Sequence, residues 1–276
     1  MAKENEIDYI RQVARIEDVP LESFRQYLAT KPYSDPHCGQ YLMDIAQILN
    51  LLPPPPLKLL DIGVGSGWTS ELFSMRGYEV LGLDISPDMI DLANNRSGNA
   101  KFTVCDYEIG PILGKFDVAV IYDALHHAED ESAVLCNIYN ALSDDGILVT
   151  IEPGVGHSTT EDSLNVMKKY GTTEKDMPFS HQKKMMQLAG FGVVEQYIRL
   201  SQLPMENIST LNGSLNQIRH GVAMGYGSST GLTSIVLARK SGNVLKEDTS
   251  SNIAETLMQL SVAHDKFVQK SDSQIK

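Results

Sequence analysis

The feature that most constrains the fold is a short apolar run that ends in three closely spaced glycines. Residues 59–69 read LLDIGVGSGWT. A continuous apolar run bounded by glycine is typical of a buried parallel strand, and a helix is expected to follow from about Thr69 to Arg76. Glycine permits a sharp turn and lets a ligand approach the backbone, and the start of the helix offers free N–H groups. The segment therefore predicts a strand, a ligand-binding turn and a helix.

Strand and helix patterns alternate through the middle of the chain. Further strands are expected at residues 79–83, 101–104, 116–121, 146–151, 192–200 and 232–239, and further helices at 88–94, 132–142 and 182–188. Short connections between alternating elements predict an α/β fold with a doubly wound, mainly parallel sheet.

Four consecutive prolines at positions 53–56 precede the first strand and block a continuing helix. We therefore expect a helical N-terminal extension over residues 1–56 and the main domain over 57–241. Residues 242–276 form a polar C-terminal tail with one amphipathic stretch, 253–262, where a helix is possible.

Acidic residues follow nearly every expected strand. Asp84 ends the strand after the glycine turn, and Asp106, Asp123 and Glu152 come after the next three. The carboxyl ends of parallel strands meet at one edge of an open sheet, where such sheets bind ligands. A single acid there would be a solvated or capping residue, but a series of acids around a glycine turn predicts a binding site.

Together these segments resemble a class I S-adenosylmethionine-dependent methyltransferase. The matching pieces are LLDIGVGSGWTS, GLDISPDMIDLA, FTVCDYE, FDVAVIYDALHH, GILVTIEP and LAGFGVVEQ, from about residue 57 to 191 and more weakly to 240. The resemblance implies a Rossmann-like, seven-stranded sheet whose last strand is antiparallel. It also implies S-adenosylmethionine as the cofactor.

By position, the resemblance implies that Asp84 accepts hydrogen bonds from the ribose hydroxyls and Asp106 accepts one from the adenine amine. Asp61 would orient the glycine loop, and Asp123 would lie near the methionine end. The full set of expected cofactor-binding residues is Asp61, Gly63, Gly65, Gly67, Asp84, Ile85, Asp106, Tyr107 and Asp123.

Charge and spacing argue against a nicotinamide dehydrogenase. The glycines follow G-x-G-x-G and not the G-x-G-x-x-G of dinucleotide sites. A site lined with acids suits the sulfonium and ammonium groups of S-adenosylmethionine, whereas it would repel a pyrophosphate.

Two histidines, His126 and His127, follow the fourth strand. Histidine titrates near neutrality and can remove the proton of a hydroxyl acceptor, so both are candidate catalytic bases, with His127 slightly preferred. The alternative is that the pair shapes the pocket. Glu152 and His157, in the loop EPGVGH, either face the same region or belong to a flexible connection with helix-capping residues.

The segments that flank the main domain leave two roles open. Tyr33, His37 and Tyr41 lie where the N-terminal extension would either close over the cofactor or only cover the edge of the sheet. The insert at 201–231 either adds to the acceptor pocket or is a loose connection.

Composition bounds the partners. Acidic residues outnumber basic ones by 35 to 23, giving a net charge of −12, which disfavours nucleic-acid binding. The three cysteines form no C-x-x-C pair, and no spacing of His, Cys and carboxylate residues indicates a metal site, so we expect no metal. We also expect a cytoplasmic protein whose thiols are reduced. No run approaches the roughly 18 apolar residues of a membrane span, so no membrane partner is expected.

The sequence thus predicts methyl transfer from S-adenosylmethionine to a small-molecule or glycan acceptor. O-methylation is slightly favoured because of the possible histidine base. The alternative is a non-catalytic regulatory protein that binds S-adenosylmethionine. A homodimer is possible, and the acceptor is not identified.

Overall fold

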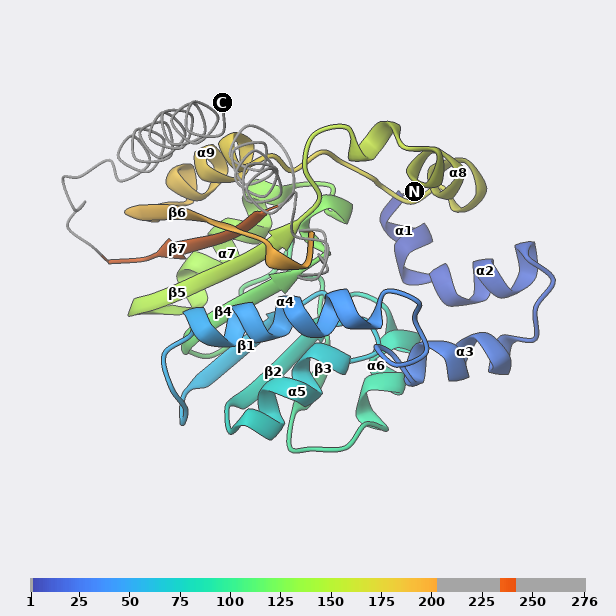
Figure 1. Ribbon diagram of the computed structural model, residues 1–276, viewed down its shortest axis with the longest axis horizontal. Helices are drawn as coiled ribbons and strands as arrows, with labels where there is room; N and C mark the ends of the chain where they lie inside the picture. Colours follow the sequence, from blue (N-terminus) through green and yellow to red (C-terminus); the bar gives the residue numbers. More distant parts are fainter. Residues whose placement is uncertain (1, 203–233, 242–276) are drawn as a thin grey trace, which may run out of the picture.

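A seven-stranded sheet forms the centre of the molecule in the computed structural model, which describes residues 2–202 and 234–241 (Figure 1). The strand order is β3-β2-β1-β4-β5-β7-β6. Neighbouring strands among the first five are parallel, whereas β7 is antiparallel to both β5 and β6. The strands are β1 (Lys58–Ile62), β2 (Glu79–Asp84), β3 (Lys101–Val104), β4 (Phe116–Tyr122), β5 (Leu142–Glu152), β6 (Val193–Ile198) and β7 (Ser234–Arg239). The predicted doubly wound sheet with an antiparallel last strand is confirmed.

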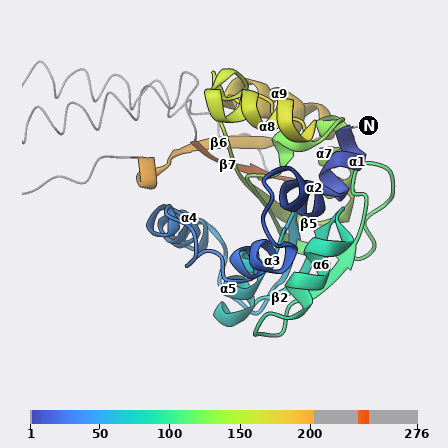
Figure 2. The same cartoon turned by 90° about the vertical axis from the view of Figure 1, so that its right-hand side faces the viewer.

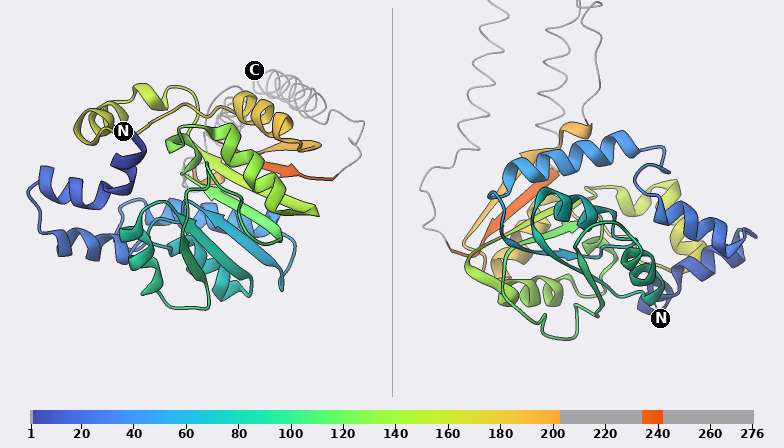
Figure 3. Two further views of the ribbon diagram at one scale, coloured as in Figure 1. Left: turned by 180° about the vertical axis from the view of Figure 1, so that it is seen from behind. Right: turned by 90° about the horizontal axis from the view of Figure 1, so that it is seen from below.

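Helices cover both faces of this sheet (Figure 3). One face carries α4 (Cys38–Leu51) and α5 (Trp68–Arg76), with α6 (Pro87–Asn94) near the β3 edge, and the other carries α7 (Glu131–Ala141) and α9 (Phe179–Ala189). Because side chains alternate along a strand, Leu59 packs in the core under α4 and α5 whereas Leu60 packs in the core under α7 and α9.

The strand order reverses between β1 and β4, since β2 and β3 lie to one side of β1 and β4 and β5 lie to the other. Open α/β sheets bind ligands at such a switch point, outside the carboxyl ends of the strands. The glycine loop after β1 and the histidines after β4 therefore flank the expected site.

The N-terminal extension contributes three further helices beside this site: α1 (Ala2–Ile7), α2 (Tyr9–Ile16) and α3 (Leu21–Ala29). Figure 2 shows them stacked between α6 and α8 (Glu161–Tyr170). Ile10, Leu28 and Leu92 form a small core between α2, α3 and α6. The extension is thus helical, as expected, and it packs at the carboxyl edge of the sheet.

One strand boundary and one helix differ most from the sequence expectation. Strand β5 begins at Leu142 and not near 146, because Leu142 pairs with Phe116 ahead of an irregularity in the ladder. Helix α8 was not expected as an element, and its N-cap is Thr160, whose side chain accepts a hydrogen bond from the backbone of Ser163.

The C-terminal tail 242–276 with its stretch 253–262, and nearly all of the insert 201–231, lie outside the described residues. Within the described ranges, no helix combines the length and the apolar character needed to cross a membrane.

Candidate functional site

The loop between β1 and α5 holds three glycines with positive φ, at +69° for Gly63, +52° for Gly65 and +79° for Gly67. A Cβ at Gly63 would lie 2.3 Å from the Cβ of Ala124, and one at Gly67 would lie 2.7 Å from the Cβ of Ala93. At Gly65 a Cβ would meet nothing within 4 Å. The outer two glycines are therefore required by packing, whereas Gly65 borders open space that a ligand can enter.

Asp61 ties this loop to the helix behind it. Its Oδ2 accepts hydrogen bonds from Thr69 Oγ1 at 2.6 Å and Ser70 Oγ at 2.7 Å, both in the first turn of α5. Burial raises the pKa of Asp61 to about 6, against the opposing effect of the two hydroxyls. Asp61 therefore links the end of β1 to the first turn of α5.

Asp84 lies at the end of β2, directly beside the loop. Its two carboxylate oxygens accept hydrogen bonds from the backbone N–H groups of Gly65 and Ser86, each at 2.8 Å. Burial raises its pKa, although both hydrogen bonds act in the opposite direction. A carboxylate has about four lone-pair sites, so it can accept further bonds from a bound diol.

Asp106, after β3, is contacted by the first helix of the chain. The Nζ of Lys3 lies 3.2 and 3.1 Å from its two carboxylate oxygens and 3.3 Å from Glu108 Oε2. Ser86 Oγ also donates to the carbonyl oxygen of Ile7 at 2.8 Å. Helix α1 therefore covers the part of the site between β2 and β3, where the adenine was expected; no local motif in the sequence signals this contact.

A pocket opens between the glycine loop and the N-terminal extension. Its walls come from the loop, from Tyr122 and Asp123 at the end of β4, and from helices α3, α4, α5 and α6. The lining residues are Leu28, Lys31, Tyr41, Gly63, Val64, Gly65, Ser66, Trp68, Met89, Tyr122 and Asp123. The extension thus supplies one wall of the pocket. Tyr41 belongs to that wall, whereas Tyr33 is 72% exposed and does not.

Three aromatic side chains hold this wall in place. The ring centroids of Tyr41, Trp68 and Tyr122 lie 5.5 to 6.2 Å apart. The ammonium of Lys31 lies 5.7 Å from the Tyr41 ring centroid. Asp123 has a positive φ of 54°, which turns the chain sharply at the end of β4.

Behind the pocket, the fully buried Asp44 on α4 connects three elements. It accepts a hydrogen bond from the Tyr122 hydroxyl at 2.7 Å. Arg199 donates to its two oxygens at 3.0 and 2.6 Å. Because Arg199 follows β6, this buried ion pair fixes α4 against both β4 and the β6 end of the sheet.

His126 lies in a short 3-10 turn, Leu125–His127, that follows β4, and its side chain is 3% exposed. Its Nδ1 lies 2.8 Å from Glu152 Oε2 at the end of β5. Glu152 Oε1 also accepts from the backbone N–H groups of Ala124 and Leu125, at 3.1 and 2.8 Å. Glu152 therefore holds both the turn and the His126 ring.

His127 has a different environment. Its Nδ1 lies 2.7 Å from the carbonyl oxygen of Thr173 and 3.5 Å from Glu6 Oε1. Burial alone would lower the pKa of His127, but Glu6 and Glu174 outweigh it and raise the pKa to about 9. A histidine that is protonated at neutral pH cannot accept a proton, so His126 is now the better placed of the two candidate bases.

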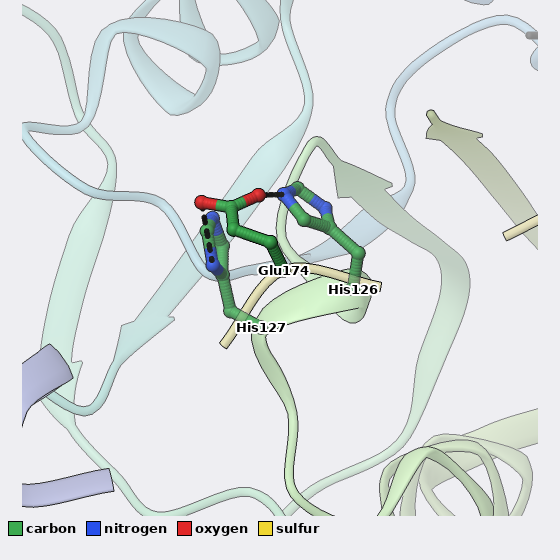
Figure 4. A group of neighbouring side chains, drawn as sticks. All are labelled: His126, His127 and Glu174. Atoms are coloured by element: carbon green, nitrogen blue, oxygen red, sulfur yellow. Dashed lines mark ion pairs between the residues drawn. The ribbon is translucent and has the colours of Figure 1, made fainter. Parts of the chain in front are cut away.

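Glu174 joins these histidines to the loop after β5, and sequence reasoning missed it. Its Oε2 lies 3.5 Å from His126 Nε2 and its Oε1 lies 3.9 Å from His127 Nδ1 (Figure 4). The same Oε2 lies 2.8 Å from His157 Nε2. Glu174 lies in a stretch without regular secondary structure, so no periodicity marks it. His157, by contrast, lies in the region expected from the sequence.

Comparison with known proteins agrees with this geometry. Residues 60–150 match a family model described as a methyltransferase domain. The chain is 33% identical over 129 residues to the non-reducing polyketide synthase ausA of Penicillium brasilianum, covering 42% of this chain and 5% of that protein. It is 34% identical over 103 residues to the magnesium-protoporphyrin O-methyltransferase of Rhodobacter capsulatus, covering 35% of this chain and 45% of that protein. The match thus spans less than half the length of these relatives.

The fold has close counterparts among solved structures. An S-adenosylmethionine-dependent methyltransferase from Mesorhizobium loti superimposes with a TM-score of 0.54 at 18% identity, covering 71% of this chain and 97% of that one. With the glycine loop and the acids at the strand ends, these comparisons show a methyltransferase domain over residues 60–150, from β1 to β5, that has the fold of the class I S-adenosylmethionine-dependent methyltransferases.

Proposed function

We propose that this chain binds S-adenosylmethionine along the glycine loop and transfers its methyl group to a small-molecule or glycan acceptor, on oxygen. The observation that carries the proposal is the pocket between Gly65 and Asp123, which continues the loop toward the end of β4. In this assignment the methionine end lies in the pocket, with Asp123 facing the cationic groups of the cofactor. Asp84 accepts the ribose hydroxyls.

The transfer itself is an in-line displacement on a carbon that the sulfonium already activates. The protein contributes chiefly by holding donor and acceptor in line. The attacking acceptor oxygen forms the new bond to the methyl carbon as the bond to sulfur breaks, and S-adenosylhomocysteine leaves. The acceptor proton passes to a base.

The preference for oxygen rests on His126. Its Nδ1 is held by Glu152 at 2.8 Å, which leaves Nε2 as the nitrogen that can accept a proton. A carboxylate on one ring nitrogen fixes the orientation of the ring and stabilises the protonated form. In the curated relatives, O-methylation is the named activity of the Rhodobacter capsulatus enzyme.

The proposal is tested first by calorimetric titration with S-adenosylmethionine. We expect one site per chain in the wild type, and loss of binding in Asp84→Ala. Asp145→Ala is the matched control, because Asp145 is an exposed acid that bonds Ser241 far from the loop. A folded wild-type protein that does not bind the cofactor would overturn the assignment.

The second step is to incubate the protein with S-adenosylmethionine carrying a labelled methyl group and with hydroxylated small molecules and oligosaccharides. Transfer of label, with formation of S-adenosylhomocysteine, supports the proposal. Cofactor binding with no transfer to any acceptor supports instead the regulatory, non-catalytic alternative.

A further inference from the structure

A cluster of histidine and carboxylate side chains lies beyond the ends of β4 and β5. His126, His127 and Glu174 each place one potential ligand atom within 4.8 Å of the others. They come from the turn after β4 and from the irregular stretch after α8, so only the fold brings them together (Figure 4). We propose that these three residues bind a divalent transition-metal ion, Zn²⁺ by the chemistry of the ligands.

The three side chains form a ligand set that suits zinc. Two imidazoles and one carboxylate are the protein ligands of many catalytic zinc sites, in which a fourth position stays open for water or substrate. His126 Nε2 and Glu174 Oε2 are 3.5 Å apart. When each metal–ligand bond is about 2.0 to 2.1 Å long, two ligand atoms of a tetrahedral site are separated by roughly the same distance as these two atoms. The His127 ring lies beside Glu174, with its Nδ1 3.9 Å from Glu174 Oε1. This Nδ1 also lies 2.7 Å from the carbonyl oxygen of Thr173, so it has to exchange that contact for the ion.

The surroundings of His126 carry the second part. A histidine that binds a metal usually donates its other ring N–H to a carboxylate or a carbonyl oxygen. His126 does this toward Glu152, which is fully buried and anchored by backbone N–H groups. The ring is therefore fixed with Nε2 directed at Glu174, before any ion is present.

Charge carries the third part. Three carboxylates, Glu6, Glu152 and Glu174, lie within 3.9 Å of the two imidazoles, and no lysine or arginine forms an ion pair with any of them in the described residues. Carboxylates in a largely buried cluster of this kind are costly unless a positive charge enters it. A divalent ion supplies two such charges.

His157 adjoins the site without belonging to the set of three. Its Nε2 is 2.8 Å from Glu174 Oε2, a hydrogen-bond distance, and its ring lies at 5.2 Å and 88° to that of His126. It can orient Glu174 by donating to it. In the proposed site His157 is a hydrogen-bond partner of Glu174, whereas His126 and His127 are ligands. In a network held only by hydrogen bonds, all three histidines would have the same role.

The metal site itself does not depend on the proposed methyl transfer, but its role does. With the ion bound, both imidazoles are ligands and neither is free to accept a proton. The ion would then hold the acceptor hydroxyl in its open position and lower the pKa of that hydroxyl, so that the proton leaves to water. The metal-free protein has only His126 for this purpose.

The experiment uses the full chain without a histidine tag. After removal of metal with a chelator, the protein is titrated with Co²⁺, whose visible absorption reports coordination by protein ligands, and Zn²⁺ is then added in competition. We expect one Co²⁺ per chain with the intense absorption of a four- or five-coordinate site, displaced by one equivalent of Zn²⁺.

Variants then locate the ion. Glu174→Gln and His126→Asn should each weaken Zn²⁺ binding by more than about tenfold, since even outer partners of metal ligands are worth roughly 10- to 100-fold. His181→Gln is the matched control, because His181 is a partly exposed histidine on α9 that pairs with Glu131 outside the cluster. It should bind like the wild type.

Near-ultraviolet circular dichroism and calorimetry with S-adenosylmethionine accompany each variant. They show whether the variant is folded and whether the cofactor site is intact, so loss of the metal site is distinguished from failure of the proposed function. The absence of stoichiometric Co²⁺ binding, or binding that folded Glu174→Gln and His126→Asn leave unchanged, would overturn the proposal.

Discussion

The ammonium of Lys3 lies 3.1 Å from Oδ2 of Asp106, so the first helix of the chain reaches the edge of the sheet at which the cofactor's adenine is expected. The two side chains are 20% and 27% exposed, and Lys3 contacts both carboxylate oxygens. The acid that should accept from the adenine amine thus already has a partner, and α1 has to yield or share that acid when the cofactor enters.

Removal of the Lys3 ammonium should therefore strengthen the binding of S-adenosylmethionine, because Asp106 is then free to accept from the adenine amine. In Lys3→Met we expect a Kd for S-adenosylmethionine about 1.4- to fivefold lower, because a partly exposed ion pair is worth about 0.2 to 1 kcal/mol. Calorimetry measures the change. Lys169→Met, which removes a similar exposed pair with Glu17, is the control and should bind as the wild type does. Weaker binding in Lys3→Met would mean that α1 belongs to the cofactor-bound state.

The glycines of the loop should respond differently to the same substitution. Gly65→Ala adds a methyl group where no protein atom lies within 4 Å, at a cost on the order of 1 to 2 kcal/mol for the positive φ. We expect a folded protein that binds S-adenosylmethionine at least about tenfold more weakly, because the methyl group narrows the pocket. Gly63→Ala instead collides with Ala124 and should lower the thermal stability more. Equal cofactor affinity in Gly65→Ala and the wild type would contradict the assignment of the loop.

His127 should make stability depend on pH. Its pKa is raised from 6.5 to about 9 in the folded protein, so the folded state binds the proton more tightly than the unfolded state. The stabilisation is fully present below about pH 6.5 and is lost as the pH rises through about 9. Urea unfolding of the wild type and of His127→Gln across this range should show the wild type losing its advantage. A difference in unfolding free energy that does not change with pH would contradict the raised pKa.

The buried pair between Asp44 and Arg199 should contribute strongly to stability. Asp44→Asn leaves the Arg199 guanidinium, only 12% exposed, without its countercharge. Breaking a buried pair by removing one partner costs about 3 to 5 kcal/mol, and we expect a value near 3 because Arg199 keeps some contact with solvent. Glu195→Gln, in the exposed pair with Arg239, should cost less than about 1 kcal/mol. Urea unfolding compares the two variants, and similar losses in both would contradict the role of Asp44.

Much of the architecture follows from local patterns. The sheet was predicted from the apolar run before Gly63, the acid at Asp84 and the alternation of strands and helices. These signals are local, because the burial of a strand and the type of a turn depend on neighbouring residues. The family resemblance supplied what these patterns do not contain, the antiparallel direction of β7. The prolines at 53–56 correctly separated α4 from β1.

The contacts that surround the site were decided by tertiary structure alone. Lys3 meets Asp106, and Glu174 meets His126, across long stretches of chain, and neither Lys3 nor Glu174 stands in a motif or a periodic pattern. Spacing in the sequence reveals metal ligands only when they lie close together on one helix or turn. The proposed ligands come from two distant segments, and the sequence therefore predicted no metal. Side chains from separate loops converge only because the parallel strands deliver their carboxyl ends, and the segments after them, to one edge of the sheet.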